Sequence, residues 1–124
     1  DVYKRQVDDS ASFMEAIREL DEKNKGFVII ADQEAHVRGI MTDGDIRRLV
    51  RRGVDFTDAP VDRFMTPSPK TIQEETTVAQ AIELMQREEI TTLVVIDPDN
   101  RLKGYVHLHD ILGRGGSVKI AVTD

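Results

Sequence analysis

The chain of 124 residues contains no cysteine. Disulfide bonds, thiolate metal sites and cysteine nucleophiles are therefore excluded. No run of apolar residues approaches the ~20 that a membrane-spanning helix needs, and no signal-peptide pattern is visible. From these absences we expect a cytoplasmic protein with no membrane partner.

The sequence has fewer basic than acidic residues. Seventeen Lys and Arg residues stand against 23 Asp and Glu residues, which gives a formal net charge of −6. Nucleic acids and anionic membranes both select for basic surfaces, so the sequence predicts neither as a partner. Hydrophobic residues make up 40% and charged residues 32%, proportions that are typical of a globular domain.

Motifs that mark catalytic sites are also missing. The sequence has no Gly-x-Ser-x-Gly elbow and no phosphate-binding loop of the Gly-x-x-x-x-Gly-Lys type. Three carboxylate pairs occur in polar stretches that read as surface: Asp8–Asp9, Glu74–Glu75 and Glu88–Glu89. We therefore expect that the chain by itself is not an enzyme.

The most informative feature that is present is an internal repeat. A shift of 65 positions, from 39 to 104, aligns residues 39–46 with 104–111, and the same shift aligns Asp32 with Asp97. Each copy is about 60 residues long, which is marginal for an independent core, so the two copies are expected to share one. Two such copies usually pack about a pseudo-twofold axis, and the two clefts between them suit small ligands.

Each repeat carries the pattern helix, strand, strand, helix. Polar residues that cap helices mark the helix starts, and short apolar runs joined by polar turns mark the strands. The fold class we predict is α/β (α+β), with two pseudo-twofold-related units, each a small three-stranded sheet with two helices. The expected helices begin at Ser12 (with Glu15), Thr42 (with Asp45), Thr77 (with Gln80) and Asp110; the expected strands are 27–30, 37–41, 93–96 and 102–106.

The repeat also predicts the domain organisation. Residues 7–52 form the first repeat, 53–64 a polar linker with Gly and Pro, 65–113 the second repeat and 114–124 a tail. Within the tail, residues 118–122 alternate like a short strand whose partner the sequence does not identify. The chain starts with Asp1, and the segment that would match residues 66–72 begins at or before residue 1, so we expect an N-terminal truncation.

The strongest candidate site is the run Gly39-x-x-Thr42-x-x-Asp45 between a strand and a helix. The start of a helix attracts phosphate, a Thr hydroxyl adds a hydrogen bond, and a carboxylate can accept two ribose hydroxyls. Arg47 and Arg48, in the first turn, add charge-assisted bonds to phosphate. The competing interpretation is that Thr42 and Asp45 only cap the helix and the arginines form a solvated helix face.

In the second repeat His107 stands at the position of Thr42, and Asp110 stands at the position of Asp45. An imidazole still donates a hydrogen bond to phosphate and becomes cationic near its ordinary pKa of ~6.5. His107, His109 and Asp110 together suggest a metal site, but no third ligand with matching spacing is evident, so no metal is expected. We expect one of the two histidines to face the cleft and the other to face solvent.

These residues resemble a tandem CBS domain pair (a Bateman module). The resemblance covers residues 7–113 and rests on the two copies of helix, strand, strand, helix, each with Gly-x-x-Thr/His-x-x-Asp, and on Met65-Thr66-Pro67 before the second copy. It implies a sensor with adenosyl-type ligands between the copies. The Thr and Asp of its motif fall on Thr42 and Asp45 and, in the second copy, on His107 and Asp110. The full set of expected ligand-binding residues also includes Arg47, Arg48, Thr71 and Thr92.

A narrower resemblance is to the C-terminal CBS pair of arabinose 5-phosphate isomerases, carried by residues 42–48, 65–72, 90–97 and 107–110. It implies the regulatory half of an isomerase of 3-deoxy-manno-octulosonate (Kdo) synthesis whose catalytic sugar isomerase domain is not in this chain. The ligand implied is an adenine or cytidine nucleotide or a nucleotide sugar such as cytidine-linked Kdo, with no essential cofactor. The assembly implied is a homodimer, within a tetramer of the parent protein.

Three other interpretations stay open. The run from Thr42 to Arg48 also resembles the CBS pair that precedes sugar nucleotidyltransferases. A structural dimerisation module with unoccupied sites is a second alternative. Isomerase activity of the chain itself is a third, and no acid–base pair in a plausible pocket supports it.

Overall fold

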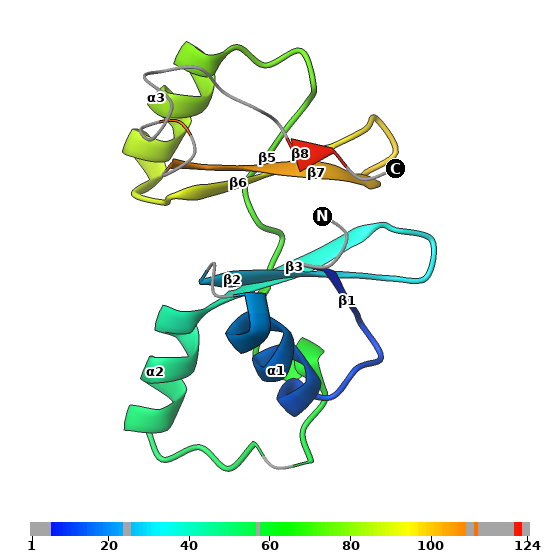
Figure 1. The fold of residues 1–124 in the computed structure, drawn as a ribbon, viewed down its shortest axis with the longest axis vertical. Coiled ribbons are helices and arrows are strands. Elements are labelled where there is room, and N and C mark those ends of the chain that lie inside the picture. Colours follow the sequence, from blue (N-terminus) through cyan, green and yellow to red (C-terminus); the bar gives the residue numbers. More distant parts are fainter. Residues whose placement is uncertain (1–5, 24–25, 57, 109–110, 112–120, 123–124) are drawn as a thin grey trace. The chain divides into compact units, whose positions relative to one another are not determined.

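The computed structural model describes residues 6–23, 26–56, 58–108, 111 and 121–122. The chain divides into two compact units, with the boundary between Pro69 and Lys70. Each unit contains one small sheet with its helices, and Figure 1 shows their elements in chain order. We call these the first unit and the second unit and describe each by itself.

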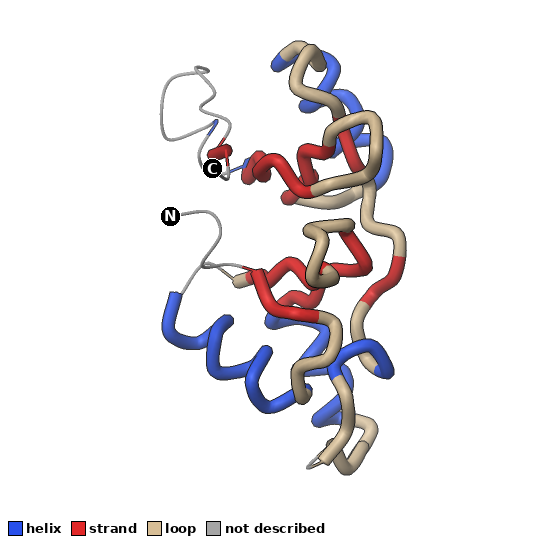
Figure 2. Tube along the Cα trace, turned by 90° about the vertical axis from the view of Figure 1, so that its right-hand side faces the viewer, coloured by secondary structure: helices blue, strands red, loops and turns tan. Residues whose placement is uncertain are grey.

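The first unit is a four-stranded sheet in the order β1-β2-β3-β4, with its helices on one side (Figure 2). β1 runs parallel to β2, whereas β2–β3 and β3–β4 are antiparallel. The elements are β1 (Gln6–Asp8), α1 (Phe13–Lys23), β2 (Phe27–Ala31), β3 (Val37–Thr42), α2 (Asp43–Arg51), the 3-10 turn η2 (Val61–Arg63) and β4 (Thr66–Pro67).

The second unit repeats this plan with the order β5-β6-β7-β8. Its first pair is again parallel and the next two are antiparallel. No described helix of either unit is long and apolar enough to cross a membrane. The elements are β5 (Thr71–Ile72), α3 (Val78–Glu88), β6 (Thr92–Ile96), β7 (Leu102–His107) and β8 (Ala121–Val122).

Strand registers repeat with the spacing seen in the sequence. Phe27 pairs with Thr42 in the first unit, and Thr92 pairs with His107 in the second. Both hairpins also carry a bulge at the same place, between Ile30 and Ala31 and between residues 95 and 96. The predicted α+β fold class is confirmed, and the two strands located in each repeat are present. Each sheet has four strands where three were expected.

The fourth strands, β4 and β8, are not equivalent to each other, because a shift of 65 positions does not align them. β4 pairs with β3 (Gly39 with Pro67), and β8 pairs with β7 (Gly104 with Val122). Residues 121–122, the described part of the alternating stretch 118–122, therefore pair with β7. The predicted closing helix at Asp110 to Leu112 lies largely outside the described residues, although Ile111 is buried.

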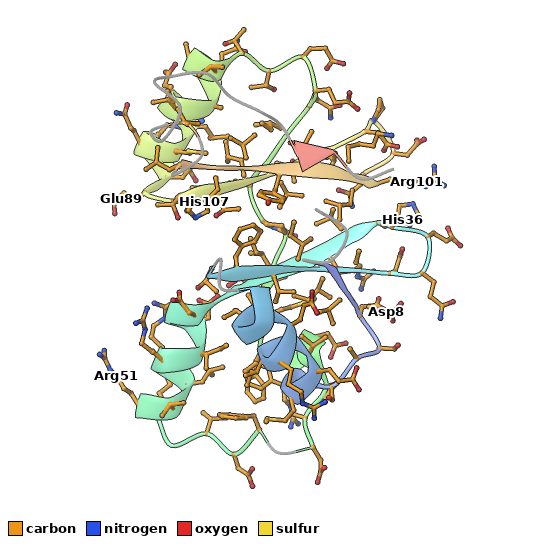
Figure 3. The ribbon with its side chains drawn as sticks, viewed as in Figure 1. Asp8, His36, Arg51, Glu89, Arg101 and His107 are labelled. Atoms are coloured by element: carbon orange, nitrogen blue, oxygen red, sulfur yellow. The ribbon has the colours of Figure 1, made fainter. Side chains whose placement is uncertain are left out.

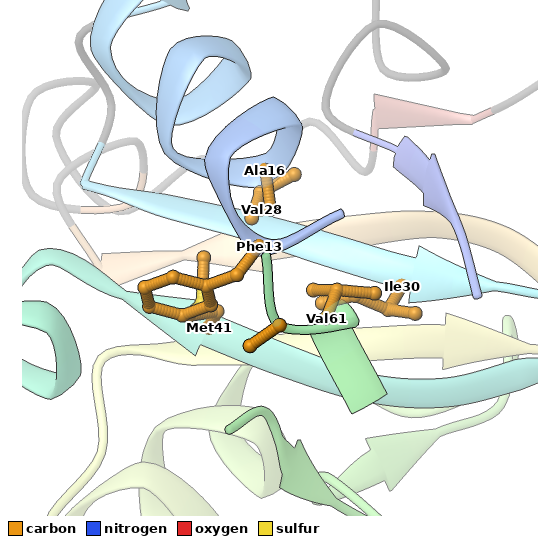
Figure 4. Close-up of a cluster of buried hydrophobic side chains, with 7 residues drawn as sticks. Phe13, Ala16, Val28, Ile30, Met41 and Val61 are labelled. Atoms are coloured by element: carbon orange, nitrogen blue, oxygen red, sulfur yellow. The ribbon is translucent and has the colours of Figure 1, made fainter. Parts of the chain in front are cut away.

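The core of the first unit lies between the sheet and α1 (Figure 4). Val28, Ile30 and Met41 project from β2 and β3 toward this side because alternate strand residues share a face. Ala59 and Val61, which belong to the stretch read from the sequence as a linker, are also buried in this core. The complete buried cluster is Phe13, Ala16, Val28, Ile30, Met41, Ala59 and Val61.

The second core forms in the same way between α3 and its sheet. Ala81 and Met85, one turn apart on α3, pack against residues of β6 and β7. The buried cluster consists of Ile72, Ala81, Met85, Leu93, Val95, Val106 and Ile111. Each unit thus has a buried apolar cluster of its own.

Candidate functional site

The junction of β3 and α2 has the geometry that the sequence predicts. Thr42 is the N-cap of α2, and its hydroxyl accepts a hydrogen bond from the N–H of Asp45 at 3.1 Å. The Asp45 carboxylate accepts in return from the N–H of Thr42 through Oδ2 at 2.9 Å. These two bonds form a complete capping box. The contacts of Thr42 and Asp45 are therefore those expected of a helix cap.

One arginine of the same helix pairs with this carboxylate, and the arginine before it pairs with another carboxylate. Arg48 forms an ion pair with Oδ1 of Asp45, and Arg47 forms one with Asp43 at 3.4 Å. The Asp45 side chain is only 16% exposed, whereas that of Arg48 is 60% exposed. Both oxygens of Asp45 are therefore engaged, one by the backbone and one by a side chain that is largely exposed.

Gly26 completes the backbone arrangement at the helix start. Its carbonyl accepts the N–H of Asp43 at 3.1 Å, which satisfies one of the N-terminal N–H groups that have no partner inside the helix. Gly26 has φ +82°, a left-handed conformation that favours glycine. The second unit repeats the contact, because the N–H of Leu108 donates to the carbonyl of Thr91 at 2.8 Å.

Three of the predicted residues of the second repeat share one face of its sheet. Thr92 lies opposite His107, and Thr71 lies opposite Val94, two residues beyond Thr92 on β6. Paired residues project to the same side, and residues two apart on a strand do so as well. Thr71, Thr92 and His107, all half-buried, therefore lie on the face opposite the cluster of α3. Asp110 and His109 lie outside the described residues.

The predicted residues thus fall into two groups. In the first unit Asp45 contacts both Thr42 and Arg48. Arg47 lies on the same helix and is paired with Asp43. Thr71, Thr92 and His107 belong to the second unit. No group of three or more His, Asp or Glu side chains able to hold a metal ion is found in the described part of the chain.

Two carboxylates at hairpin tips have lowered pKa values. Burial raises the pKa of Asp32, but hydrogen bonds from the N–H groups of His36 and Glu34 and from the His36 ring outweigh it and lower this pKa overall. At the equivalent Asp97, the N–H of Arg101 is the main cause of the lowered pKa. Figure 3 shows His36 and Arg101 at these tips. Both carboxylates accept turn N–H groups and so stabilise the hairpins.

A third lowered pKa belongs to Glu88, near the end of α3. The Lys70 ammonium, 3.1 Å from the carboxylate, holds this pKa below its ordinary value. The pair ties the residue before β5 to α3, and the Lys70 carbonyl also accepts from the N–H of Val94 at 3.2 Å. These contacts are structural and do not form a reactive group.

The chain is similar in sequence to known proteins. The CBS domain family model matches residues 6–52 and 61–115. The arabinose 5-phosphate isomerase KdsD of Escherichia coli K12 is 37% identical over 109 residues, which are 88% of this chain and 33% of that protein. The chain spans about a third of the length of the curated relatives it matches.

Solved structures agree in fold. The CBS domain pair of protein MJ0100, in complex with 5′-methylthioadenosine and S-adenosyl-L-methionine, has a TM-score of 0.79 and 25% identity and covers 90% of each chain. The structure of CBSX2 in complex with AMP has a TM-score of 0.77 and 25% identity, and the match covers 88% of this chain and 84% of that one.

Proposed function

Because the chain belongs to the CBS domain family, we propose that its two repeats form the regulatory, ligand-sensing module of a sugar-phosphate isomerase similar to arabinose 5-phosphate isomerase. The ligand is a nucleotide or nucleotide sugar bound between the repeats. The observation that carries the proposal is the pair of equivalent strand ends at Thr42 and His107, in a fold whose solved relatives hold adenosyl compounds.

Each predicted residue has a chemical role in this proposal. In the first repeat Asp45 accepts the ribose hydroxyls, Thr42 donates to ribose or phosphate, and Arg47 and Arg48 pair with phosphate. In the second repeat the proposed ligand-binding residues are Thr71, Thr92, His107 and Asp110. His107, where the first repeat has Thr42, makes the two sites chemically different, so we expect them to differ in ligand preference.

Regulation follows if the ligand favours one arrangement of the module over another. An effector shifts an equilibrium only by its difference in affinity for the two states. We propose a cytoplasmic homodimer through the CBS pairs, within a tetramer of the longer isomerase of Kdo synthesis. The logic of feedback in that synthesis favours a late product, such as cytidine-linked Kdo, as the ligand.

A thermal-shift screen tests the proposal. The ligands are AMP, ADP, ATP, CMP, CTP, cytidine-linked Kdo and S-adenosylmethionine. A ligand at a hundredfold excess over its dissociation constant stabilises by ~2.7 kcal/mol, which raises the melting temperature by several degrees in a domain of this size. The preferred base then separates adenine-nucleotide sensing from pathway feedback.

A matched pair of variants separates ligand binding from helix capping. Asp45→Ala removes a capping carboxylate at the proposed site, and Gln80→Ala removes the equivalent capping group of α3, which is not among the proposed nucleotide-binding residues. We expect the ligand-induced shift to disappear in Asp45→Ala and to persist in Gln80→Ala. Absence of a shift with every ligand would reject the sensor.

One observation supports a second candidate, a structural dimerisation module. Both oxygens of Asp45 and the hydroxyl of Thr42 already have partners within α2. If no nucleotide binds and the chain still dimerises in sedimentation equilibrium, this second function is the better description.

A further inference from the structure

The tips of the β2–β3 and β6–β7 hairpins share one pattern of hydrogen bonds. In the first tip, Oδ1 of Asp32 accepts the N–H groups of Glu34 and His36 at 2.9 and 2.8 Å. In the second tip, the equivalent bonds to Asp97 measure 2.8 and 2.9 Å. The backbone N–H of each aspartate also donates to the carbonyl at the far end of its turn at 3.0 Å. Differences between the two tips therefore arise from their side chains.

The last side chain of the turn differs in its chemistry. A shift of 65 positions places Arg101 where the first repeat has His36, and both lie at the tips (Figure 3). Nδ1 of His36 lies 3.1 Å from Oδ2 of Asp32 and 3.9 Å from Oε2 of Glu34, whereas Arg101 lies 3.6 Å from Asp99. Arginine is always charged, whereas histidine gains its charge near pH ~6.5. The first tip thus has a titratable cation where the second has a permanent one.

The charged groups next to the first tip are mainly acidic. Asp8 pairs with Ala31, the residue before the turn, and the N–H of Asp9 donates to the Ala31 carbonyl at 2.9 Å. β1 therefore adds two carboxylates to the two of the tip, and β3 adds one guanidinium, that of Arg38, 3.9 Å from Asp9. A positive charge on the His36 ring is consequently attracted by more groups than repel it.

The first tip also has the less favourable turn residue. Ala35 has φ +70°, and Asn100, at the equivalent place, has φ +65°. Asparagine tolerates this left-handed conformation, whereas the Cβ of alanine is crowded in it. The contacts of the Asp32 side chain therefore hold a turn that its own residues favour less than those of the second tip do.

We propose that the tip at residues 32–36 is a pH-responsive element, held more tightly when His36 is protonated, whereas the tip at residues 97–101 does not respond. Protonation places a full charge on a ring that already contacts the Asp32 carboxylate, and a charge-assisted hydrogen bond is stronger than a neutral one. The added stability is present below about pH 6 and is lost as the pH rises toward 8.

The partner carboxylate does not titrate in this window. Burial raises the pKa of Asp32, but hydrogen bonds from His36 and Glu34 lower it overall, so the carboxylate is ionised at pH 5.5 and at pH 8. β3 runs from this tip to Thr42 at its other end. The pH-responsive element is therefore part of the same hairpin as the candidate ligand site but does not depend on ligand binding.

Amide hydrogen exchange, followed by NMR, tests this proposal. The exchange rates of the Glu34 and His36 amides are measured at pH 5.5 and pH 8, and each is divided into the rate of an unstructured chain at the same pH. We expect this protection to be about two- to fivefold higher at pH 5.5, as for a partly exposed ion pair. The amides of Asp99 and Arg101 are the internal reference and should keep their protection.

Two substitutions bracket the two states of the ring. His36→Arg copies the second tip, so its Glu34 amide should have the higher protection at both pH values. His36→Gln has a polar side chain without a charge and should give the lower protection at both. Both variants retain His107 and His109, so a pH effect that comes from those histidines would persist in them.

Two results would overturn the proposal. One is equal protection of the first tip at pH 5.5 and pH 8 in the wild-type protein. The other is a pH response that persists in His36→Arg and His36→Gln, or that is equally large at the second tip. No nucleotide is added in these measurements, so either result leaves the proposed sensor function as it stands.

Discussion

Arg48 is ion-paired with Asp45, the carboxylate that we propose holds ribose hydroxyls. A ligand that takes Asp45 must displace this guanidinium, and a phosphate on the ligand offers the guanidinium a new partner. Arg48→Gln should therefore weaken AMP binding and leave adenosine binding unchanged or stronger. A hydrogen bond to a charged group contributes about 1.5–3 kcal/mol, so the preference for AMP should fall about tenfold or more.

Isothermal titration calorimetry of AMP and adenosine checks this prediction. Arg51→Gln is the matched control, because Arg51 is exposed at the other end of α2 (Figure 3). The idea fails if both substitutions change the AMP-to-adenosine ratio equally.

Thr42 and Thr77 are equivalent in capping, and their substitutions should separate capping from binding. Thr42→Ala and Thr77→Ala each remove a hydroxyl that accepts a helix N–H, so each should lower the free energy of unfolding by about 1 kcal/mol. Thr→Ser at either position keeps the hydroxyl and should cost much less. Urea unfolding measures these changes, and adding nucleotide should stabilise Thr77→Ala but not Thr42→Ala.

Gly39 lies where two strands and Met65 approach closely. A Cβ at this position would lie 2.8 Å from the carbonyl oxygen of Thr66 and 2.5 Å from the sulfur of Met65. Gly39→Ala should therefore separate β3 from β4 and lower the melting temperature by several degrees. Gly44→Ala is the control, since its Cβ would meet nothing closer than 3.6 Å and alanine favours the helix by roughly 0.5–1 kcal/mol. Equal melting temperatures for both variants would contradict the steric argument.

Phe13 and Val78 occupy the same repeat position with different burial. Phe13→Ala should lower the stability by about 3–5 kcal/mol, because it empties the core of the first unit. Val78→Ala should change the stability by no more than about 0.5 kcal/mol, because Val78 is partly exposed. Chemical denaturation of both variants measures the difference. A large loss in Val78→Ala would show that its side chain is covered in solution.

Asp97 should make the second hairpin acid-sensitive. The N–H of Arg101 lowers the pKa of this carboxyl in the folded protein below its ordinary value, with burial opposing and Asp99 adding to the shift. A group with a lowered folded-state pKa stabilises above its ordinary pKa of ~3.9, and the stabilisation is lost as the pH falls through the folded-state value. Asp97→Asn keeps an acceptor in the turn and should lose less stability than wild type below pH ~4.

Urea unfolding at neutral pH and at pH ~3 compares the two proteins. A pH dependence that is identical in wild type and Asp97→Asn would show that other carboxylates account for the acid sensitivity. The pKa of Asp32, the carboxylate at the other hairpin tip, is also lowered. In that case Asp32 is the next residue to substitute.

Features that depend on neighbouring residues were predictable from the sequence. The caps at Thr42 and Thr77 join groups three positions apart, and the structure has both capping boxes. The hairpin turn at residues 97–101 likewise depends on the side chain of Asp97 and nearby N–H groups. The candidate site at Thr42 and Asp45 could be predicted because its two residues are three positions apart. The ion pair of Asp45 with Arg48 also lies within one helical turn.

Contacts between distant segments needed the folded structure. By its internal repeat and its caps, the chain alone determines two α+β units and their order, because the same local preferences recur 65 positions apart. Only the tertiary structure shows that Ala59 to Phe64, polar and Pro-containing in sequence, packs on α1, and that β8 pairs with β7. Backbone bonds between distant segments carry no local sequence signal, because any residue's N–H and C=O can form them.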